Sequence, residues 1–462
     1  MSPAKFRRAL RTPVSVENLF AWHERPGAFL RLSPPWDHAT VVEHTGGIRD
    51  GARVVLSVPA GPIQTRWVIE HRDYQFNKQF RDILLQGPFA RFEHTHSFYA
   101  DSATTSSLED VIEYELPMGA VGALAGGWYA DSTLDQVFRY RHAVLLADLE
   151  RHAQFAQRAR MKIAVTGASG FIGSQLCAFL TTGGHTVLRI GRGAVKPGVV
   201  DVAWDPEHAV LNPADLEGVD AVIHLAGANI AERWTDTHKK AIRDSRLQGT
   251  TLIAKTIASL ARKPAVLLSA SAIGIYGDRG DEVLDETSAL GTGFLADVGR
   301  EWEASTAVAE MAGIRVVHMR TGIVQGAAGG ALGKQLPFFR AGVGGPLAGG
   351  KNWVSPIALD DEIGAMHFCL MQENVRGAVN FVAPHPITNA EYTEALGSVL
   401  HRPAMLPVPA FGLYALFGKE MVDSTVLTSL RVRPMVLERE GFQFRHPTIR
   451  QILEFELGRA PS

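Results

Sequence analysis

The chain has 462 residues, which is too long for a single hydrophobic core and predicts about two or three domains. Hydrophobic residues make up 46% and charged residues 20% of the chain, and a formal net charge of −2 gives no sign of a basic surface for nucleic acid or anionic membranes. The only cysteines, Cys177 and Cys369, lie too far apart for a disulfide framework or a zinc-ligand pattern, so a reducing cytoplasm is expected.

Residues 1–155 carry strand-like segments followed by one long helical segment. A glycine-rich turn is predicted over Met118–Gly127, and a helix over Leu134–Phe155, whose apolar residues form one stripe. Strands followed by one long helix favour an α+β domain in which the helix lies across a curved sheet. The predicted strands, in which apolar and polar residues tend to alternate, are Ala52–Val58, Gln64–Arg72, Phe80–Leu85, Ala90–Tyr99 and Ser107–Leu116.

Histidines stand out on these predicted strands. His94 and His96 alternate on one face of a strand, and His71 lies on another. No carboxylate completes a metal-ligand pattern with them, so no metal site is expected, and the three are predicted to face water or the polar mouth of a cavity. The larger apolar strand residues are predicted to form core or cavity wall; they are Trp67, Ile69, Phe80, Phe92 and Phe98.

The pattern changes at Met161, where MKIAVTGASGFIG reads like the start of an independent protein. We infer a fusion of two genes, joined at His152–Arg160. Residues 161–386 then alternate strands and helices, which predicts a Rossmann-type, doubly wound parallel sheet. Residues 387–462 are predicted to form a small C-terminal cap, to which a glycine-rich loop region at 329–356 contributes. The predicted elements are Lys162–Thr166, Phe171–Thr182, Thr186–Ile190, Asp220–Leu225, Asp236–Leu260, Ala265–Ser269, Phe294–Met311 and Arg315–Met319.

The first strand of this region runs directly into a glycine-rich turn. Gly167 permits the tight turn, Gly170 lets the backbone approach a pyrophosphate, and Gly173 lets the following helix pack closely on the strand. The free N–H groups and positive dipole end of that helix then face the phosphates. The turn therefore predicts a dinucleotide site, with contacts from Thr166, Gly167, Ser169, Gly170, Phe171, Ile172 and Gly173.

The end of the second strand distinguishes the two nicotinamide cofactors. It reads Arg189-Ile190-Gly191-Arg192, without the acidic residue that binds the ribose 2′-hydroxyl of NAD. Arg192 suits the 2′-phosphate of NADP, so NADP is predicted ahead of NAD. Further cofactor contacts are expected where other strands end, at Leu225, Ala226, Gly227, Ser269 and Arg320.

The motifs from residue 161 onward resemble the extended short-chain dehydrogenase/reductase superfamily, also called the NAD(P)-dependent epimerase/dehydratase superfamily. The strings TGASGFIG, HLAG, SASAIGIYG and RTGIVQG occur in that family's order, and RWTDTHKKAIRDSRLQGTT is similar to its atypical epimerase-family branch. This resemblance implies an NADP-dependent oxidoreductase or epimerase. Less specifically, residues 1–155 resemble the START-like (SRPBCC) superfamily, which includes polyketide cyclases and implies a helix-grip fold around a hydrophobic ligand.

The superfamily's catalytic pattern is only partly present. The resemblance implies a serine, an asparagine and a Tyr-x-x-x-Lys pair that together carry out acid–base chemistry beside the nicotinamide. Ser271 matches the serine, but Arg246 occupies the asparagine position, and Leu295 and Gly299 occupy the tyrosine and lysine positions. The one Tyr-x-x-x-Lys, Tyr74–Lys78, lies in the wrong half and is a coincidence. The candidate catalytic residues are therefore Ser271, Arg246 and Tyr276.

Three functions follow from these motifs. The first is an NADP-dependent oxidoreductase or epimerase-like enzyme for an unidentified small molecule, with a fused domain that binds a hydrophobic ligand. The second is a sensor or regulator that binds NADP(H) without turnover, and the third is cyclase or dehydratase activity in residues 1–155.

Asp360 and Asp361 are expected to tie the cap to the Rossmann core. No secretory signal is recognisable and no apolar run reaches the ~18 residues of a membrane span, so no membrane partner is expected.

Overall fold

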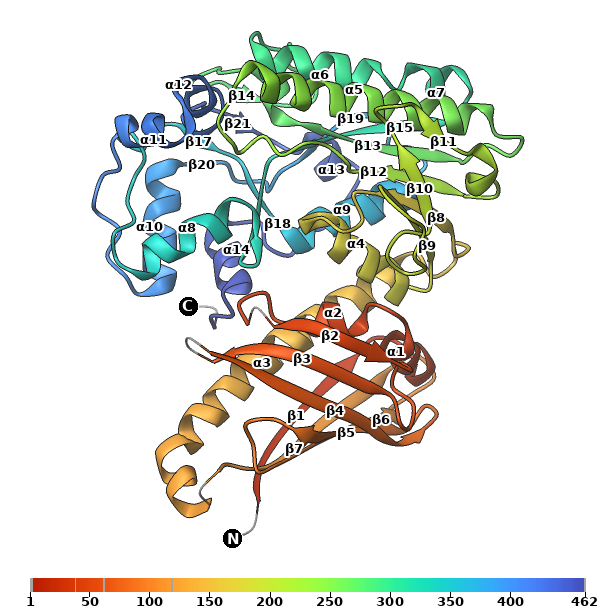
Figure 1. Cartoon of the computed structure of the whole chain (residues 1–462), viewed down its shortest axis with the longest axis vertical. Coiled ribbons are helices and arrows are strands. Elements are labelled where there is room, and N and C mark those ends of the chain that lie inside the picture. The colour runs from red at the N-terminus through yellow and green to blue at the C-terminus, as the bar shows by residue number, and fades with distance from the viewer. Residues whose placement is uncertain (1–2, 38, 61–62, 118, 461–462) are drawn as a thin grey trace. The chain divides into compact units, whose positions relative to one another are not determined.

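The structure is a computed structural model that describes residues 3–37, 39–60, 63–117 and 119–460 (Figure 1). Contacts between residues divide the chain into two compact units. The first is made mainly of residues 1–159, and the second begins at Arg160. Each unit has its own sheet.

The first unit is an antiparallel sheet of seven strands in the order β1-β7-β6-β5-β4-β3-β2. Helices α1 (Val16–Glu24) and α2 (Ala28–Leu32) follow the first strand, and α3 (Gly119–Gln154) follows the last. Apolar side chains of α3 pack into the same cores as strand residues, so this helix covers one face of the sheet. The strands are β1 (Ala4–Thr12), β2 (Thr40–Thr45), β3 (Arg53–Ala60), β4 (Ile63–Gln75), β5 (Gln79–Gln86), β6 (Arg91–Ala100) and β7 (Ser106–Glu115).

The five strands predicted in this half correspond to β3–β7, within a few residues at each end. The predicted turn over Met118–Gly127 is wrong from residue 119 onward, because α3 already begins at Gly119; Met118 itself lies outside the described residues. Alanines between the glycines supply the helix propensity that the glycines lack. Strands β1 and β2 were not predicted, since β1 carries basic residues on its outer face and depends on pairing with the distant β7.

The second unit is an eight-stranded sheet in the order β11-β10-β9-β8-β12-β13-β15-β19, in which only β11 is antiparallel to its neighbour. Figure 1 shows α5, α6 and α7 on one face of this sheet and α4 and α9 on the other. The predicted parallel Rossmann sheet is therefore present. Its strands are β8 (Lys162–Thr166), β9 (Thr186–Gly191), β10 (Val202–Asp205), β11 (Val210–Leu211), β12 (Ala221–His224), β13 (Val266–Ala272), β15 (Arg315–Thr321) and β19 (Gly377–Phe381).

The helices of this unit follow the alternating pattern, with one change: the helix predicted over Phe294–Met311 is broken in two near Ser305. The helices on the sheet are α4 (Phe171–Thr182), α5 (Asp236–Ser259), α6 (Phe294–Ala304), α7 (Ala307–Met311) and α9 (Leu359–Met371), with short turns η1 (Pro213–Leu216) and η2 (Ile273–Tyr276).

The remaining elements lie mostly toward the C-terminus. They are β14 (Val283–Leu284), β16 (Ile323–Gly326), α8 (Gly330–Arg340), β17 (Trp353–Val354), β18 (Pro356–Ala358), β20 (Ile387–Thr388), α10 (Asn389–Leu400), α11 (Ala410–Phe417), α12 (Lys419–Met421), η3 (Val422–Val426), β21 (Arg431–Val432), α13 (Met435–Arg439) and α14 (Ile449–Glu456).

The glycine-rich region predicted as a loop contains helix α8, so that prediction is wrong over residues 330–340. Leu332, Leu336 and Phe339 recur at helical spacing and are buried in a small core shared with α10 and α14. Glycines at the start of this segment and beyond its end obscured the periodicity. Residue contacts keep this C-terminal core within the second unit.

Helix α9 joins the C-terminal segment to the sheet. Asp361, in its first turn, accepts hydrogen bonds from the backbone nitrogens of Arg445 and His446, each at 2.9 Å. This contact is the structural tie expected of that aspartate. The next residue, Glu362, is fully buried; Thr321 donates to its Oε1 at 2.9 Å, and its Oε2 has no partner among the described residues. Burial raises the pKa of Glu362 to about 8, so the side chain is protonated at neutral pH.

Replacing Glu362 by glutamine is expected to remove a pH-dependent loss of stability. Because the folded-state pKa is raised, the carboxyl group's contribution is complete below its usual pKa and is lost as pH rises through about 8. Urea unfolding should show the variant and the wild type nearly equal at about pH 5, with the variant gaining up to about 1.4 kcal/mol per pH unit between there and about pH 8, above which the difference levels off. Glu310→Gln, at an exposed position on α7, is the control. A difference that stays constant with pH would contradict this account.

Candidate functional site

The glycine turn lies where the strand order of the second sheet reverses. Strands β9 and β10 lie on one side of β8, and β12 and β13 lie on the other, so the carboxyl ends of β8 and β12 border the crevice where such sheets bind ligands. Gly167 has a φ of +68°, and Gly170 N donates to its carbonyl oxygen at 2.9 Å. A Cβ on Gly173 would lie 2.1 Å from that same oxygen, so only glycine lets α4 begin this close to the strand.

The hydroxyl of Thr166 fixes the neighbouring strand end. It lies 2.7 Å from Nδ1 of His224 and accepts from the backbone nitrogens of Leu225 at 3.0 Å and Ala226 at 3.2 Å. Because the oxygen accepts two N–H groups, its proton goes to His224, which must therefore carry its own proton on Nε2. Burial lowers the pKa of His224 to about 4, which keeps the ring neutral. The loop from Leu225 to Gly227 is thus held beside the glycine turn.

Arg192 follows β9 directly at the same edge of the sheet, and its side chain is exposed. The acidic residue nearby, Asp201, is already engaged: it accepts from the backbone nitrogens of Arg189 and Gly198 and lies 3.4 Å from the Arg189 guanidinium. Arg192 at this strand end is therefore available to bind an anion, whereas the Asp201 carboxylate already has hydrogen-bond partners.

Three of the predicted site residues, Ser271, Tyr276 and Arg320, belong to one buried hydrogen-bond network. A fourth residue, which was not predicted as a site residue, connects them. Ser271 Oγ donates to Glu303 Oε1 at 2.7 Å, and Arg320 donates to both Glu303 oxygens at 2.8 and 2.9 Å. Arg320 Nη1 also donates to the Tyr276 hydroxyl at 3.0 Å, and that hydroxyl donates to Asn380 Oδ1 at 2.8 Å. Glu303 is thus the centre of the network.

The protonation states in this network follow from its contacts. Burial alone would raise the pKa of Glu303, but its hydrogen bonds and ion pair with Arg320 outweigh burial and lower it. Burial raises the pKa of Tyr276, whose side chain has no exposed surface. In this conformation the Tyr276 hydroxyl and the Arg320 guanidinium are held by protein partners rather than presented to a ligand. Ser269, predicted as a cofactor contact, is fully buried in β13.

The positions that should hold the usual tyrosine and lysine are packed against η2. A Cβ on Gly299 would lie 3.0 Å from Cβ and Cγ1 of Ile275, and Leu295 lies beside Gly274. A lysine side chain at residue 299 would therefore have to displace Ile275. The close approach of α6 and η2 at Gly299 thus disfavours a lysine at the position predicted for it.

Arg246, from α5, is a half-buried cation without a described carboxylate partner. Its Nη1 donates to the carbonyl oxygens of Ala228 at 3.2 Å and Ile242 at 3.0 Å, and its guanidinium lies 4.9 Å from the Trp302 ring centroid. Burial lowers the pKa of Arg246 to about 10, which still leaves it charged at neutral pH. A Cβ on Gly227 would lie 3.6 Å from its guanidinium carbon, so the cation stands beside the loop that follows β12.

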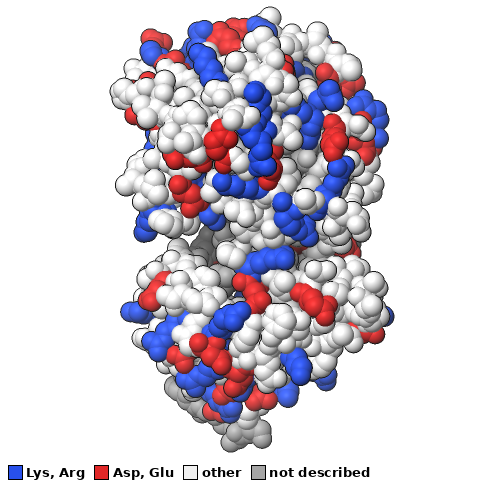
Figure 2. Space-filling model, turned by 90° about the vertical axis from the view of Figure 1, so that its right-hand side faces the viewer, with Lys and Arg blue, Asp and Glu red and all other residues white. Residues whose placement is uncertain are grey.

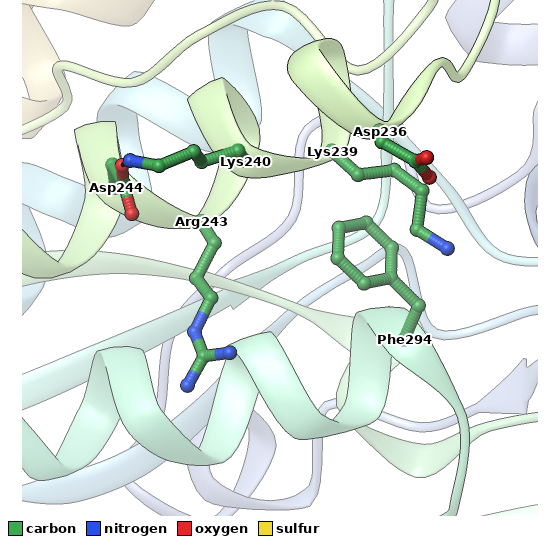
Figure 3. Close-up of a pocket in the computed structure, with 6 residues that line it drawn as sticks. All are labelled: Asp236, Lys239, Lys240, Arg243, Asp244 and Phe294. Carbon is green, nitrogen blue, oxygen red and sulfur yellow. Dashed lines mark hydrogen bonds and ion pairs between the residues drawn. The ribbon is translucent and has the colours of Figure 1, made fainter.

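A separate surface pocket of about 400 Å³ opens between the start of α5 and Phe294 (Figure 3). Its lining includes the cations Lys239, Lys240 and Arg243. Each of them already faces a carboxylate: Lys239 pairs with Glu420, Lys240 with Asp244 and Arg243 with Glu301. The pocket therefore offers no unpaired positive charge to an anionic ligand.

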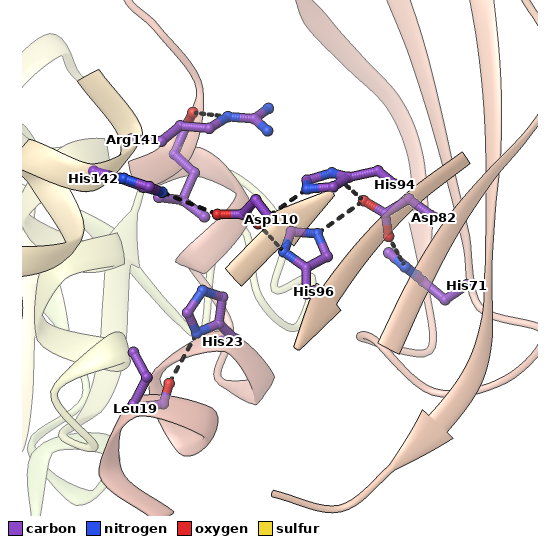
Figure 4. A network of polar contacts seen from close by, with 10 residues as sticks. Leu19, His23, His71, Asp82, His94, His96, Asp110, Arg141 and His142 are labelled. Atoms are coloured by element: carbon purple, nitrogen blue, oxygen red, sulfur yellow. Dashed lines mark hydrogen bonds and ion pairs between the residues drawn. The ribbon is translucent and has the colours of Figure 1, made fainter. Parts of the chain in front are cut away.

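The first unit contains a buried cluster of histidines and aspartates (Figure 4). His94 and His96 project from β6 between Asp82 of β5 and Asp110 of β7, which pair with them across the sheet. The prediction that His71, His94 and His96 face water or a cavity mouth is wrong, because all three are buried, with exposed fractions of 7%, 2% and 7%. Cross-strand pairing supplies the carboxylates that are distant in sequence, and sequence reasoning missed both.

Of the two histidines on β6, one carries a positive charge and the other is neutral. Burial opposes the charged form of His96, but its contacts with Asp110 and Asp82 outweigh this and raise its pKa to about 9. Burial and the neighbouring charge of His96 lower the pKa of His94 to about 4. The histidine contacts also hold the pKa values of Asp82 and Asp110 well below the usual range, against the effect of burial.

Comparison with known proteins agrees with the geometry of the second unit. A family model described as the NAD dependent epimerase/dehydratase family matches residues 163–330, and a domain of unknown function matches residues 408–456. An epimerase family protein of Mycobacterium bovis is 42% identical over 298 residues, which are 64% of this chain and 98% of that protein. Human epimerase family protein SDR39U1 is 34% identical, over 63% of this chain and 97% of its own length.

Two solved structures are similar as well. A nucleoside-diphosphate sugar epimerase from Corynebacterium glutamicum has a TM-score of 0.81 at 32% identity and covers 98% of this chain and 90% of its own, so its likeness extends over both units. Human SDR39U1, solved with NADPH, has a TM-score of 0.59 at 30% identity and covers 64% of this chain and 99% of its own. The chain therefore belongs to the NAD-dependent epimerase/dehydratase family, among the epimerase family proteins.

Proposed function

We propose that this protein is an NADP-dependent oxidoreductase or epimerase-like enzyme that acts on a small molecule. The observation that carries the proposal is the glycine turn at the reversal of strand order, with Arg192 exposed at the end of β9. The NADPH in the solved human relative supports the same cofactor.

The residues present fit such a cofactor. The turn from Gly167 to Gly173 and the first N–H groups of α4 suit a pyrophosphate, because side chains are absent where the backbone must be approached. The loop from Leu225 to Gly227 would border the ribose and adenine, and Arg192 would pair with the 2′-phosphate. The bound nicotinamide would supply hydride transfer.

For the substrate we propose Arg246 as the residue that binds an anionic group or a developing negative charge. It is a half-buried cation beside the loop that follows β12, its described partners are two backbone carbonyls and the Trp302 ring rather than a carboxylate, and a cation so placed could stabilise negative charge. Ser271 and Tyr276, the other predicted catalytic residues, would position the active-site wall through Glu303 and Arg320 rather than react.

A second candidate is a protein that binds NADP(H) as a sensor, without turnover. The packing of Gly299 on Ile275 favours it, because it leaves little space for a lysine at that position, and residue 295 is a leucine rather than the usual proton donor. The two candidates share the cofactor site and differ in whether hydride leaves the cofactor.

For the first unit we propose a START-like ligand-binding role, supported by its antiparallel sheet and covering helix α3. The hydrophobic ligand and the cyclase or dehydratase activity remain predictions, and the histidine–aspartate cluster adds a polar centre to this interior.

Basic and acidic side chains are interspersed on the face shown in Figure 2, in keeping with a small-molecule partner rather than a nucleic acid. Among the described residues, no helix combines the length and apolarity needed to cross a membrane.

Replacing Arg192 by alanine is expected to weaken NADPH binding by about 10- to 100-fold, because a charge-assisted contact to the 2′-phosphate is lost. NADH affinity should stay unchanged, since NADH lacks that phosphate. Calorimetric titration of wild type and variant with both cofactors measures this. Arg262→Ala is the control, because Arg262 precedes β13 and lies at the opposite edge of the sheet. Equal losses for NADPH and NADH would contradict the assignment, and no binding of either cofactor by the wild type would overturn the proposed function.

Replacing Arg246 by methionine is expected to lower kcat/KM by about 100-fold while NADPH affinity is retained. NADPH oxidation should be screened with carbonyl compounds and nucleoside-diphosphate sugars, the latter named for the Corynebacterium glutamicum protein. Arg243→Met, one turn earlier on α5 at an exposed position, is the matched control. Turnover that survives in Arg246→Met would exclude this role, and a wild type that binds NADPH but neither oxidises it nor interconverts the epimers of any sugar tested would favour the sensor.

A further inference from the structure

We propose that the histidine–aspartate cluster of the first unit is a binding site for one divalent transition-metal ion of the zinc class. The ligands would be Asp82, His94 and His96, each of which offers one ligand atom within 4.8 Å of the other two. Two histidines and one carboxylate are a common ligand set of metal sites with an open coordination position.

The distances between the ligand atoms fit such an ion. His96 Nε2 lies 3.4 Å from Asp82 Oδ2, and His94 Nδ1 lies 3.7 Å from the same oxygen. Zinc–ligand bonds of about 2.0–2.1 Å in a tetrahedron place neighbouring ligand atoms roughly 3.3 Å apart. The two distances from the histidines to Asp82 thus exceed this spacing by no more than a few tenths of an ångström, and the His94 and His96 ligand atoms lie within 4.8 Å of each other.

Asp110 orients both rings from the far side. Its Oδ1 accepts from His94 Nε2 at 3.0 Å and lies 2.8 Å from His96 Nδ1. A carboxylate on the second nitrogen of each ligating histidine is the usual support of a metal site, because it fixes the ring and its tautomer. Protons held on the Asp110 side leave the lone pairs of both histidines directed at Asp82.

Further contacts hold the two carboxylates. His71 Nδ1 lies 2.7 Å from Asp82 Oδ1, the oxygen that the metal would not use, and His142 Nε2 lies 3.0 Å from Asp110 Oδ2. His23 Nδ1 lies 2.9 Å from the Leu19 carbonyl oxygen within α1 (Figure 4). The Asp82 side chain keeps 19% of its surface exposed, whereas the His94 side chain keeps 3%.

The test is metal binding by the full-length protein, with any affinity tag removed. After dialysis against EDTA, calorimetric titration with Zn²⁺ should give about one equivalent per chain, and Co²⁺ should give the visible absorption of a four-coordinate ion. Zn²⁺ should also raise the Tm of the wild type. Absence of Zn²⁺ binding by the folded wild type would overturn the proposal and leave a proton as the bridging cation.

Variants then locate the bound ion. His94→Ala and Asp82→Asn should lower Zn²⁺ affinity more than 100-fold, and Asp110→Asn about 10- to 100-fold, with circular dichroism confirming the fold. His44→Ala, an exposed histidine on β2, is the matched control and should leave affinity unchanged. Wild-type affinity in Asp82→Asn would overturn the assignment, and it remains informative even if His94→Ala fails to fold.

Discussion

The contact between residue 173 and the carbonyl oxygen of Gly167 determines much of the second unit. Because no side chain intervenes there, α4 begins immediately after the turn and its first N–H groups face the crevice. The Thr166 hydroxyl then binds the backbone after β12, so two neighbouring strand ends are joined by one side chain. The floor of the crevice is thus made of backbone groups in fixed positions, and differences in substrate must arise from the segments that surround it.

Buried charges have different kinds of partner at different sites. In the network around Glu303, the carboxylate accepts hydrogen bonds from Ser271 and from two nitrogens of Arg320, so every charge there has an oppositely charged partner. Arg246 is instead held by backbone carbonyls and the Trp302 ring, and in the histidine–aspartate cluster two carboxylates share their histidine partners.

The sequence predicted elements whose signals are local. Strand β8 and helix α4 matched to the residue, because the glycine spacing marks both the end of one and the start of the other. Alternation likewise indicated β3–β7. Helix α8 was missed because glycines flank it, although Leu332, Leu336 and Phe339 carried a helical period that could have revealed it.

Site residues that depend on long-range pairing could not be predicted in the same way. Glu303 becomes central only when α6 packs against β13 and β15, and Asp82 meets His94 only through the register of β5 and β6. One signal was available: Asp82 and Asp110 stand at inward positions of alternating strands, where a charged residue without a partner would be too costly. Pairing the predicted hairpins would have brought them to the histidines.

The close approach of Gly299 to Ile275 also bears on how this branch of the family can change. A lysine introduced at residue 299 would clash with Ile275 before it could serve any catalytic purpose, and a smaller residue at 275 would first leave a cavity beside the glycine. Whichever of the two substitutions came first, the protein with that single substitution would be less stable. A lysine at residue 299 is therefore expected to need a compensating change at residue 275.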